Sequence, residues 1–166
     1  MNTDDKRTKL DKIDLEILRI LQGQGRITNA KLAQEVGLSA PPMLERVKKL
    51  ERNGFIKSYR AILDANKLGC RFMVFVALNL DVSQLPRVKD FETIVKDMHE
   101  VLECHHIAGD IDLMLKVGVA DQETFKDFVI GRLSPIKGIN RIQSWVVLST
   151  SKETTEIDLM HARIKK

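Results

Sequence analysis

The sequence predicts an α+β protein of two domains, with helices in the N-terminal part and alternating strands and helices in the C-terminal part. Apolar residues recur with helical spacing up to about residue 50, whereas the nearly unbroken apolar run Phe72–Leu80 is typical of a buried strand. With 43% hydrophobic and 30% charged residues, the 166-residue chain can form packed cores. We expect domains at 1–63 and 71–150, a linker at 64–70, and a C-terminal tail at 151–166.

The first expected helix runs from Asp11, its N-cap, to about Gln22, where the Gly23-Gln24-Gly25 stretch breaks it. Asp14 lies near the positive end of this helix, where a carboxylate is favourable. The spacing of the apolar residues predicts one buried stripe, formed by Ile13, Ile17, Ile20 and Leu21.

Two further helices are expected, joined only by a Gly-Leu-Ser turn. Thr28 caps the first of them and Gly37 closes it, and the second begins near Ser39 or Ala40. Such a pair, with cationic residues on the second helix, is typical of the DNA-binding helix-turn-helix, although short helical hairpins without that role are also common. The buried positions are expected to be Leu32, Ala33 and Val36 in the first helix, and Leu44, Val47 and Leu50 in the second.

The segment Phe55–Leu63 follows the Asn53-Gly54 helix end and is rich in β-branched and aromatic residues. It is predicted to be a strand, either a wing of the helix-turn-helix domain or a linker strand. The short polar segment Asp64–Gly69 is the expected hinge between the domains.

The C-terminal domain is predicted to follow the order β-α-β-β-α-β, which is the ferredoxin-like arrangement. In that arrangement both helices lie on one face of the sheet, yet Met73, Phe75 and Ala77 of the first strand point to the other face. An uncovered apolar face predicts packing against a second subunit in a two-fold dimer. The expected strands are Phe72–Leu80, Val101–Ala108, Ile111–Val117 and Ile139–Leu148; one helix contains Leu85, Val88, Phe91, Ile94, Val95 and Met98, and the other, capped by Asp121, contains Phe125, Phe128, Val129 and Leu133.

Basic charge is concentrated in the N-terminal domain. Residues 1–63 hold 13 Lys and Arg against 8 Asp and Glu, whereas residues 64–166 hold 14 against 15. This asymmetry places a polyanion-binding surface in the first domain, although basic surfaces also serve solubility alone.

Several other classes are disfavoured. The polar N-terminus and the lack of about 18 consecutive apolar residues predict a cytoplasmic protein without membrane insertion. Cys70 and Cys104 are far apart, which argues against a disulfide framework or a sulfur-rich zinc site. In the run Glu103-Cys104-His105-His106 alternate residues of a strand face opposite ways, so four converging metal ligands are not expected and no metal site is predicted. Trp145 is expected to fill a core or an interface.

The third expected helix carries the candidate DNA contacts. Arg46 is the first candidate for a base-specific contact, because arginine can bond guanine bidentately, and Lys48, Lys49 and Arg52 are expected at phosphates. Pro41 and Pro42 remove the N–H groups that an N-cap at Ser39 would bind, so its hydroxyl is left for a phosphate or for water.

Six motifs are combined over residues 10–150: Leu10-Asp11-Lys12-Ile13-Asp14, Gly25-Arg26-Ile27-Thr28-Asn29, Val36-Gly37-Leu38-Ser39, the run from Leu44 to Ile56, Glu103-Cys104-His105, and the run from Ala108 to Val117. With these motifs the chain resembles the Lrp/AsnC family of bacterial and archaeal transcriptional regulators. Its Ala40-Pro41-Pro42-Met43 run departs from the Pro-x-Pro-Cys run usual in leucine-responsive members, and the tail after Thr150 has no clear match.

The resemblance implies a regulator that binds promoter DNA at the nucleoid, forms dimers that assemble into tetramers or octamers, and responds to leucine or another amino acid without a cofactor. From the residues alone, Asp110 and Asp112 are most simply explained as the aspartates that are common at hairpin turns. The resemblance implies an amino-acid effector site there instead. The implied DNA-binding residues are Thr28, Ser39, Pro41, Pro42, Glu45, Arg46, Lys48, Lys49 and Arg52, and the implied effector-binding residues are Gly109, Asp110, Ile111 and Asp112.

Two rival functions are considered. The first is an enzyme similar to the sirohaem decarboxylases, in which His105 or His106 would act near a tetrapyrrole. The second is a stand-alone amino-acid sensor whose N-terminal domain meets protein instead of DNA. The basic residues of the third helix favour the regulator, and no enzymatic activity is expected.

Overall fold

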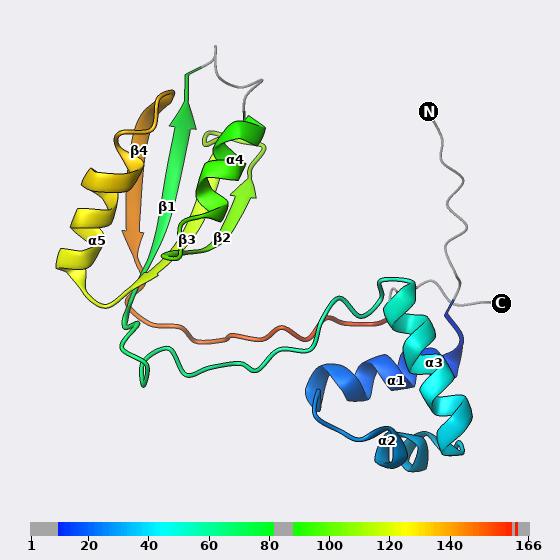
Figure 1. The fold of residues 1–166 in the computed structure, drawn as a ribbon. Helices are drawn as coiled ribbons and strands as arrows, with labels where there is room; N and C mark the ends of the chain where they lie inside the picture. Colours follow the sequence, from blue (N-terminus) through cyan, green and yellow to red (C-terminus); the bar gives the residue numbers. More distant parts are fainter. Residues whose placement is uncertain (1–9, 82–87, 161, 163–166) are drawn as a thin grey trace, which may run out of the picture. The chain divides into compact units, whose positions relative to one another are not determined.

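The structure is a computed structural model that describes residues 10–81, 88–160 and 162. The chain forms two compact units (Figure 1). The first comprises residues 1–62 together with 152–166, and the second comprises residues 63–151. The C-terminal tail therefore packs with the N-terminal helices although it follows the second unit in the sequence.

The first unit contains α1 (Lys12–Gly23), α2 (Asn29–Val36) and α3 (Ala40–Arg52), close to the predicted bounds. Local signals position all three. Asp11 caps α1 in a reciprocal capping box, Thr28 caps α2, and Gly37 ends α2 in the left-handed conformation at φ 75°.

The core of the first unit corrects one prediction. Leu44 was expected on the buried stripe of α3, but it is exposed, and Met43 is buried instead. At 100° per residue, Met43 lies within about 40° of both Val47 and Leu50 around the helix, whereas Leu44 is turned away from that stripe. Among the described residues, the buried cluster is Leu10, Ile17, Ile20, Leu32, Ala33, Met43, Val47 and Leu50.

The predicted strand at Phe55–Leu63 is wrong, because none of the described residues between α3 and β1 forms a strand. A strand needs a partner for its backbone hydrogen bonds, and none of the described strands pairs with this segment. Ile56 packs against the core of the first unit, but the apolar side chains farther along remain in solvent, with Ile62 82% and Leu63 68% exposed.

The second unit has the predicted βαββαβ order. Its sheet has the strand order β2-β3-β1-β4 with every neighbouring pair antiparallel, as the ferredoxin-like arrangement requires. Leu85, predicted in the first helix, lies outside the described residues, and the second helix ends in a π-helical segment, η2. The elements are β1 (Phe72–Leu80), α4 (Val88–Lys96), β2 (Val101–His106), β3 (Leu113–Val119), α5 (Gln122–Phe128), η2 (Val129–Leu133) and β4 (Ile139–Val146).

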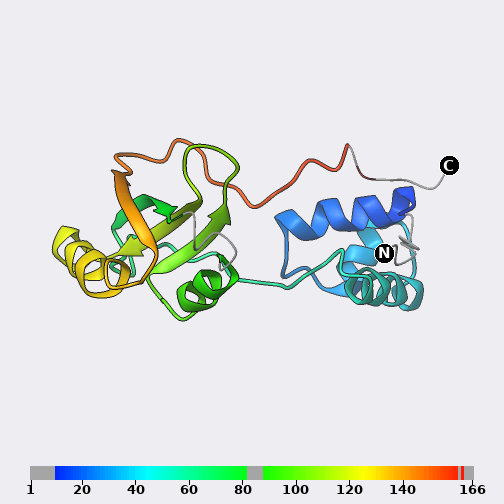
Figure 2. The same ribbon diagram turned by 90° about the horizontal axis from the view of Figure 1, so that it is seen from above.

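The two faces of this sheet differ. Both helices cover the same face (Figure 2), and the buried apolar side chains of β1 and β3 alternate onto it. On the opposite face, Phe75 is 39% exposed and lies in register with Trp145, which is 47% exposed. We call this second surface the open face of the sheet.

Candidate DNA-binding and effector sites

The start of α3 is exposed, and its N-cap differs from those of α1 and α2. Ser39 is the N-cap, yet none of the described residues donates a capping hydrogen bond to its hydroxyl. Pro41 and Pro42 explain this, because they occupy the positions whose N–H groups an N-cap normally binds. The missing cap bond agrees with the sequence-based prediction, whereas a phosphate contact by the hydroxyl stays a prediction; Ser39, Pro41 and Pro42 are all exposed.

The outer face of α3 carries a row of polar side chains. Glu45, Lys48 and Arg52 are exposed and Lys49 is half-buried. The only ion pair within this row is a 3.8 Å contact between Lys48 Nζ and Glu45 Oε1 among the described residues, which is too long for a strong interaction. Lys48 and Arg52 are thus presented to solvent in successive turns of α3, with Lys49 half-buried beside them.

Thr28, the other predicted DNA contact, has a structural task. Its Oγ1 accepts a hydrogen bond from the Lys31 backbone N–H at 3.2 Å, which caps α2. The residue is nevertheless exposed, and its hydroxyl oxygen keeps a second lone pair.

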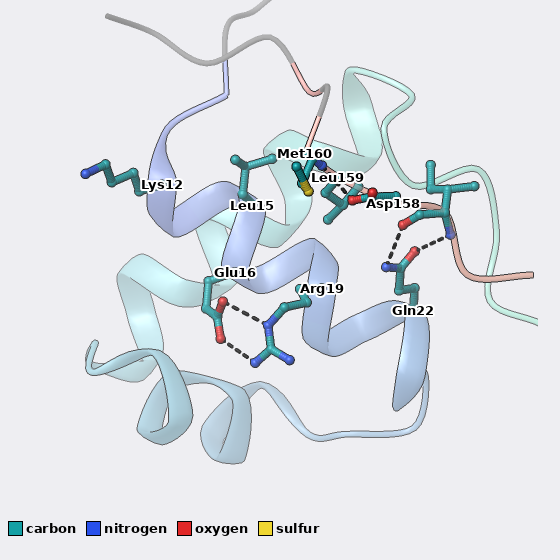
Figure 3. A pocket seen from close by; sticks show the side chains of 9 residues that line it. Lys12, Leu15, Glu16, Arg19, Gln22, Asp158, Leu159 and Met160 are labelled. Carbon is teal, nitrogen blue, oxygen red and sulfur yellow. Dashed lines mark hydrogen bonds and ion pairs between the residues drawn. The ribbon is translucent and has the colours of Figure 1, made fainter.

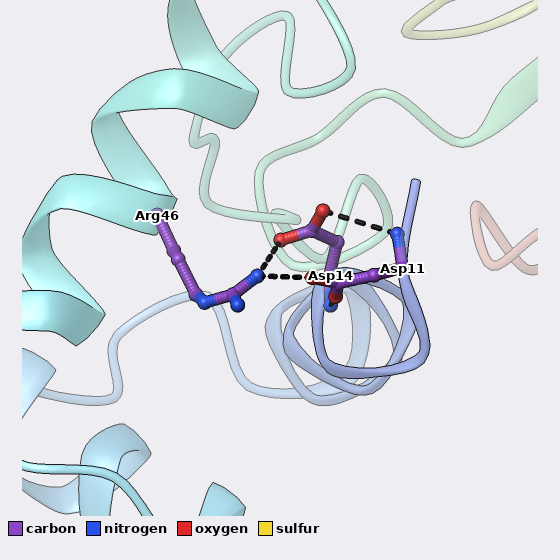
Figure 4. Close-up of polar contacts among 3 residues, drawn as sticks. All are labelled: Asp11, Asp14 and Arg46. Atoms are coloured by element: carbon purple, nitrogen blue, oxygen red, sulfur yellow. Dashed lines mark hydrogen bonds and ion pairs between the residues drawn. The ribbon is translucent and has the colours of Figure 1, made fainter. Parts of the chain in front are cut away.

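Arg46 is placed differently from its neighbours on α3. Its Nη1 donates to Asp11 Oδ2 and to Asp14 Oδ1, each at 2.7 Å, so that α3 is joined to the start of α1 (Figure 4). The Arg46 side chain is 29% exposed and that of Asp14 only 4%. These hydrogen bonds raise the pKa of Arg46; burial opposes ionisation of Asp11, but the bonds from the Asp14 backbone and Arg46 outweigh it and leave the pKa of Asp11 lowered.

Sequence reasoning missed this contact because Arg46 is 35 residues from Asp11 and 32 from Asp14. Two features of the sequence could have indicated it. Arg46 comes directly before the buried Val47 of α3, and Asp11 and Asp14 stand within one turn at the start of α1, where they can receive a cation.

The predicted effector turn is tied firmly to β1. The Asn79 side-chain amide donates to the Asp110 backbone carbonyl at 2.7 Å, and the Leu80 N–H donates to Asp112 Oδ2 at 2.8 Å. The Asp112 N–H in turn donates to the Leu78 carbonyl at 3.0 Å. Gly109 and Asp110 are exposed, whereas Ile111 and Asp112 are half-buried. The two aspartates therefore have different environments, one anchoring the turn and one facing solvent.

The histidine run does not form a metal site. Cys104 lies in register with Leu115 on the covered face of the sheet, whereas His105 lies opposite Met114 on the open face. On that face Glu103 bridges His105 and Lys116 at 3.1 and 3.2 Å, and these hydrogen bonds keep the pKa of Glu103 below its ordinary value. Within the described residues, no group of three or more potential ligands is close enough to hold a metal ion.

Sequence reasoning also missed the contact between α1 and the tail segment, by which we mean residues 152–160 and 162. The Gln22 carboxamide donates to the Ile157 carbonyl and accepts from the Ile157 N–H, both at 3.1 Å. Ala162 packs against the core of the first unit. Figure 3 shows the shallow groove that this contact leaves between α1 and residues 157–160.

The geometry defines a class of protein: a helix-turn-helix unit with an exposed cationic helix, joined to a βαββαβ unit. Comparisons with known families agree. The model of the winged helix-turn-helix DNA-binding domain matches residues 10–57, and that of the Lrp/AsnC ligand binding domain matches residues 73–157.

Known relatives cover most of the chain. The leucine-responsive regulatory protein of Escherichia coli K12 is 38% identical over 148 residues, which are 89% of this chain and 90% of the relative. A transcriptional regulator from Neisseria meningitidis, solved as an L-Met complex, superposes with a TM-score of 0.87 at 35% identity, covering 92% of this chain and 99% of that one. An AsnC family regulator from Agrobacterium tumefaciens superposes with a TM-score of 0.85 at 33% sequence identity. The match covers 90% of this chain and 97% of that one.

The chain belongs to the Lrp/AsnC family. It is a transcriptional regulator with a DNA-binding helix-turn-helix domain and a ligand-binding domain, which confirms the predicted family, fold class and functional class. Within the described part of the chain, no helix has the length and apolarity to cross a bilayer.

Proposed function

We propose that the protein binds promoter DNA as a homodimer, or as a tetramer or octamer of such dimers, with α3 in the major groove. An amino acid, leucine or another, bound at the turn of residues 109–112 then alters operator affinity or assembly. The observation that carries the DNA part is the exposed start of α3, where Ser39 has no capping hydrogen bond among the described residues and is followed by the exposed cationic residues Lys48 and Arg52.

The side chains of α3 and the N-cap residues of α2 and α3 suit distinct roles on DNA. Lys48, Lys49 and Arg52 supply charge for phosphates, and Ser39 supplies a hydroxyl for the same purpose. Glu45 can accept a hydrogen bond from the cytosine amino group. Pro41, Pro42 and the Thr28 methyl group offer apolar contact to thymine methyl groups.

The test is selection of bound sequences from a random duplex pool at fixed salt, with and without each amino acid. We expect a two-fold symmetric site whose enrichment changes with one amino acid. Lys49→Gln should weaken binding to all duplexes and reduce the salt slope by about one, whereas Lys137→Gln, an exposed lysine of the second unit, should change neither. Retention that depends on salt but not on sequence would contradict the proposal.

The open face of the sheet supports the homodimer. Phe75 and Trp145 are side by side and partly exposed there, which is the kind of apolar surface that a second copy covers. Trp145→Glu is expected to shift the protein to monomers in sedimentation velocity, and an unchanged sedimentation coefficient would contradict this interface.

The effector turn has the chemistry to hold an amino acid. Asp110 is exposed and offers a carboxylate for an α-ammonium group, and backbone N–H groups of the turn suit an α-carboxylate. Asp110→Asn should weaken binding of the responding amino acid in calorimetry, while Asp127→Asn on α5 should not. Asp112, which holds the turn on β1, is the less suitable contact.

A regulator that acts on promoters works where the chromosome is, and we therefore propose action in the cytoplasm at the nucleoid. The free thiols of Cys70 and Cys104 suit a reducing compartment. The decarboxylase-like alternative predicts a tetrapyrrole absorbance change when sirohaem is added, and we expect none.

A further inference from the structure

We infer that Arg46 is a positioning residue, which holds α3 on the start of α1 through the carboxylates of Asp11 and Asp14 and makes no contact with DNA itself. The inference rests on the proposed binding of DNA by α3. It replaces the expectation that Arg46 is the base-specific contact.

Asp11, Asp14 and Arg46 form a closed network of hydrogen bonds, two donated by backbone N–H groups and two by the arginine (Figure 4). Asp11 Oδ1 accepts from the Asp14 N–H at 2.7 Å, and Asp14 Oδ2 accepts from the Asp11 N–H at 3.2 Å, which is the capping box of α1. The other oxygen of each carboxylate accepts from Arg46 Nη1. Every carboxylate oxygen is therefore used, and the capping box orients both groups before the arginine reaches them.

Burial makes the contact necessary. Asp14 is the one buried charged residue among those described, at 3% exposure. A carboxylate in that position needs a cation or several hydrogen bonds, because removing it from water is costly. Arg46 supplies the cation, and moving its guanidinium to a base would leave Asp14 without it.

Electrostatics also oppose a direct role on DNA. Two carboxylates and one guanidinium leave the network with one net negative charge, which repels phosphate. The exposed cations of α3, Lys48 and Arg52 among them, have no comparable acidic neighbours at hydrogen-bonding distance among the described residues.

The geometry distinguishes the two roles experimentally, because a single nitrogen of Arg46 makes both contacts. An ammonium group can therefore replace that nitrogen, whereas it cannot reproduce a bidentate bond to guanine. Arg46→Lys is expected to retain most operator affinity, whereas Arg46→Gln is expected to lose about tenfold because fewer molecules hold α3 in the binding-competent position.

The experiment measures operator and random-duplex affinity of the full-length protein at several salt concentrations for Arg46→Gln, Arg46→Lys, Asp14→Asn and the Arg46→Gln/Asp14→Asn double variant. Lys48→Gln serves as the control for a phosphate contact. We expect Arg46→Gln to weaken both duplexes alike without changing the salt slope, and the double variant to be no weaker than Arg46→Gln alone. Lys48→Gln should reduce the slope by about one.

A lower salt slope in Arg46→Gln, or a lost preference at one base pair that Arg46→Lys does not restore, would overturn the inference. Thermal melting of each variant shows whether it is folded at the assay temperature. If Arg46→Gln is unfolded there, the affinities of Arg46→Lys and Asp14→Asn decide between a positioning role and a DNA contact. Failure of the proposed function is a separate outcome, because the wild type would then show no operator preference.

Discussion

The two units of this protein hold their elements in place by different means. In the second unit, hydrogen bonds between the backbones of paired strands set the register of the sheet, and the helices pack on it through apolar side chains. In the first unit, three short helices share a smaller apolar cluster. The network of Arg46 with Asp11 and Asp14 and the contact of Gln22 with Ile157 add hydrogen bonds that orient these elements.

The difference follows from geometry. Paired strands already fix orientation through regularly spaced hydrogen bonds, whereas apolar packing between helices is nondirectional and permits small rotations. A helix that must present its outer face to DNA gains from charged contacts that allow one orientation only. Substitutions in each unit can break or sharpen this contrast.

The largest effect is expected in the core of the sheet. Leu115 on β3 is fully buried, and Leu115→Ala should lower the free energy of unfolding of the second unit by about 2–5 kcal/mol in denaturant titrations. Ile130→Ala, at a side chain that is 62% exposed, is the matched control and should have little effect. Equal losses in the two variants would show that the sheet core does not dominate.

A smaller loss is expected on the open face, where packing is close at Gly118. A Cβ added there would lie 2.9 Å from Cys70 Sγ and 3.1 Å from Leu102 Cδ1. Both neighbours are side-chain ends that can shift, so Gly118→Ala should cost about 1–3 kcal/mol.

Thermal unfolding would measure this cost. Gly131→Ala, where a Cβ meets open space, should be neutral or slightly stabilising. A stabilised Gly118→Ala variant would contradict close packing at this strand.

The polar contacts of the first unit predict a third effect. Gln22→Ala removes both hydrogen bonds to Ile157 and should release the tail segment, at a cost of about 0.5–1.5 kcal/mol. Faster proteolysis or amide exchange at residues 152–160 would report the release. Gln34→Ala, on the exposed side of α2, should leave the tail unchanged; equal protection in both variants would contradict the contact.

The smallest effect is expected from pH. Because the pKa of Asp11 is lower in the folded protein than in the unfolded chain, its contribution to stability is present above the unfolded value and disappears as pH falls through the folded value. Stability of the first unit should therefore fall as the pH is lowered below about 4.

Asp11→Asn tests this while keeping a good N-cap. Thermal melts between pH 6 and pH 3 should show a flatter acid dependence for this variant than for the wild type. An identical dependence would mean that other carboxylates account for the acid sensitivity.

Chemistry within a few residues made several features predictable. The caps at Asp11, Thr28 and Asp121 and the left-handed Gly37 depend on neighbours within one helical turn. The missing cap bond at Ser39 follows from two adjacent prolines. The βαββαβ order follows equally from local periodicity, since short apolar runs mark the strands and apolar residues at three-to-four spacing mark the helices.

Tertiary structure alone decided the rest, because the partners are distant in the sequence. The choice between Met43 and Leu44 depended on which part of α3 meets the other helices, and Phe55–Leu63 stayed irregular for want of a partner strand. Arg46 became part of the α1 cap, and Gln22 met Ile157 across 135 residues, only because folding brought them together. Composition and spacing determine which residues can form helices, strands and caps. The packed chain determines which side chains are buried and which partner each polar or charged group contacts.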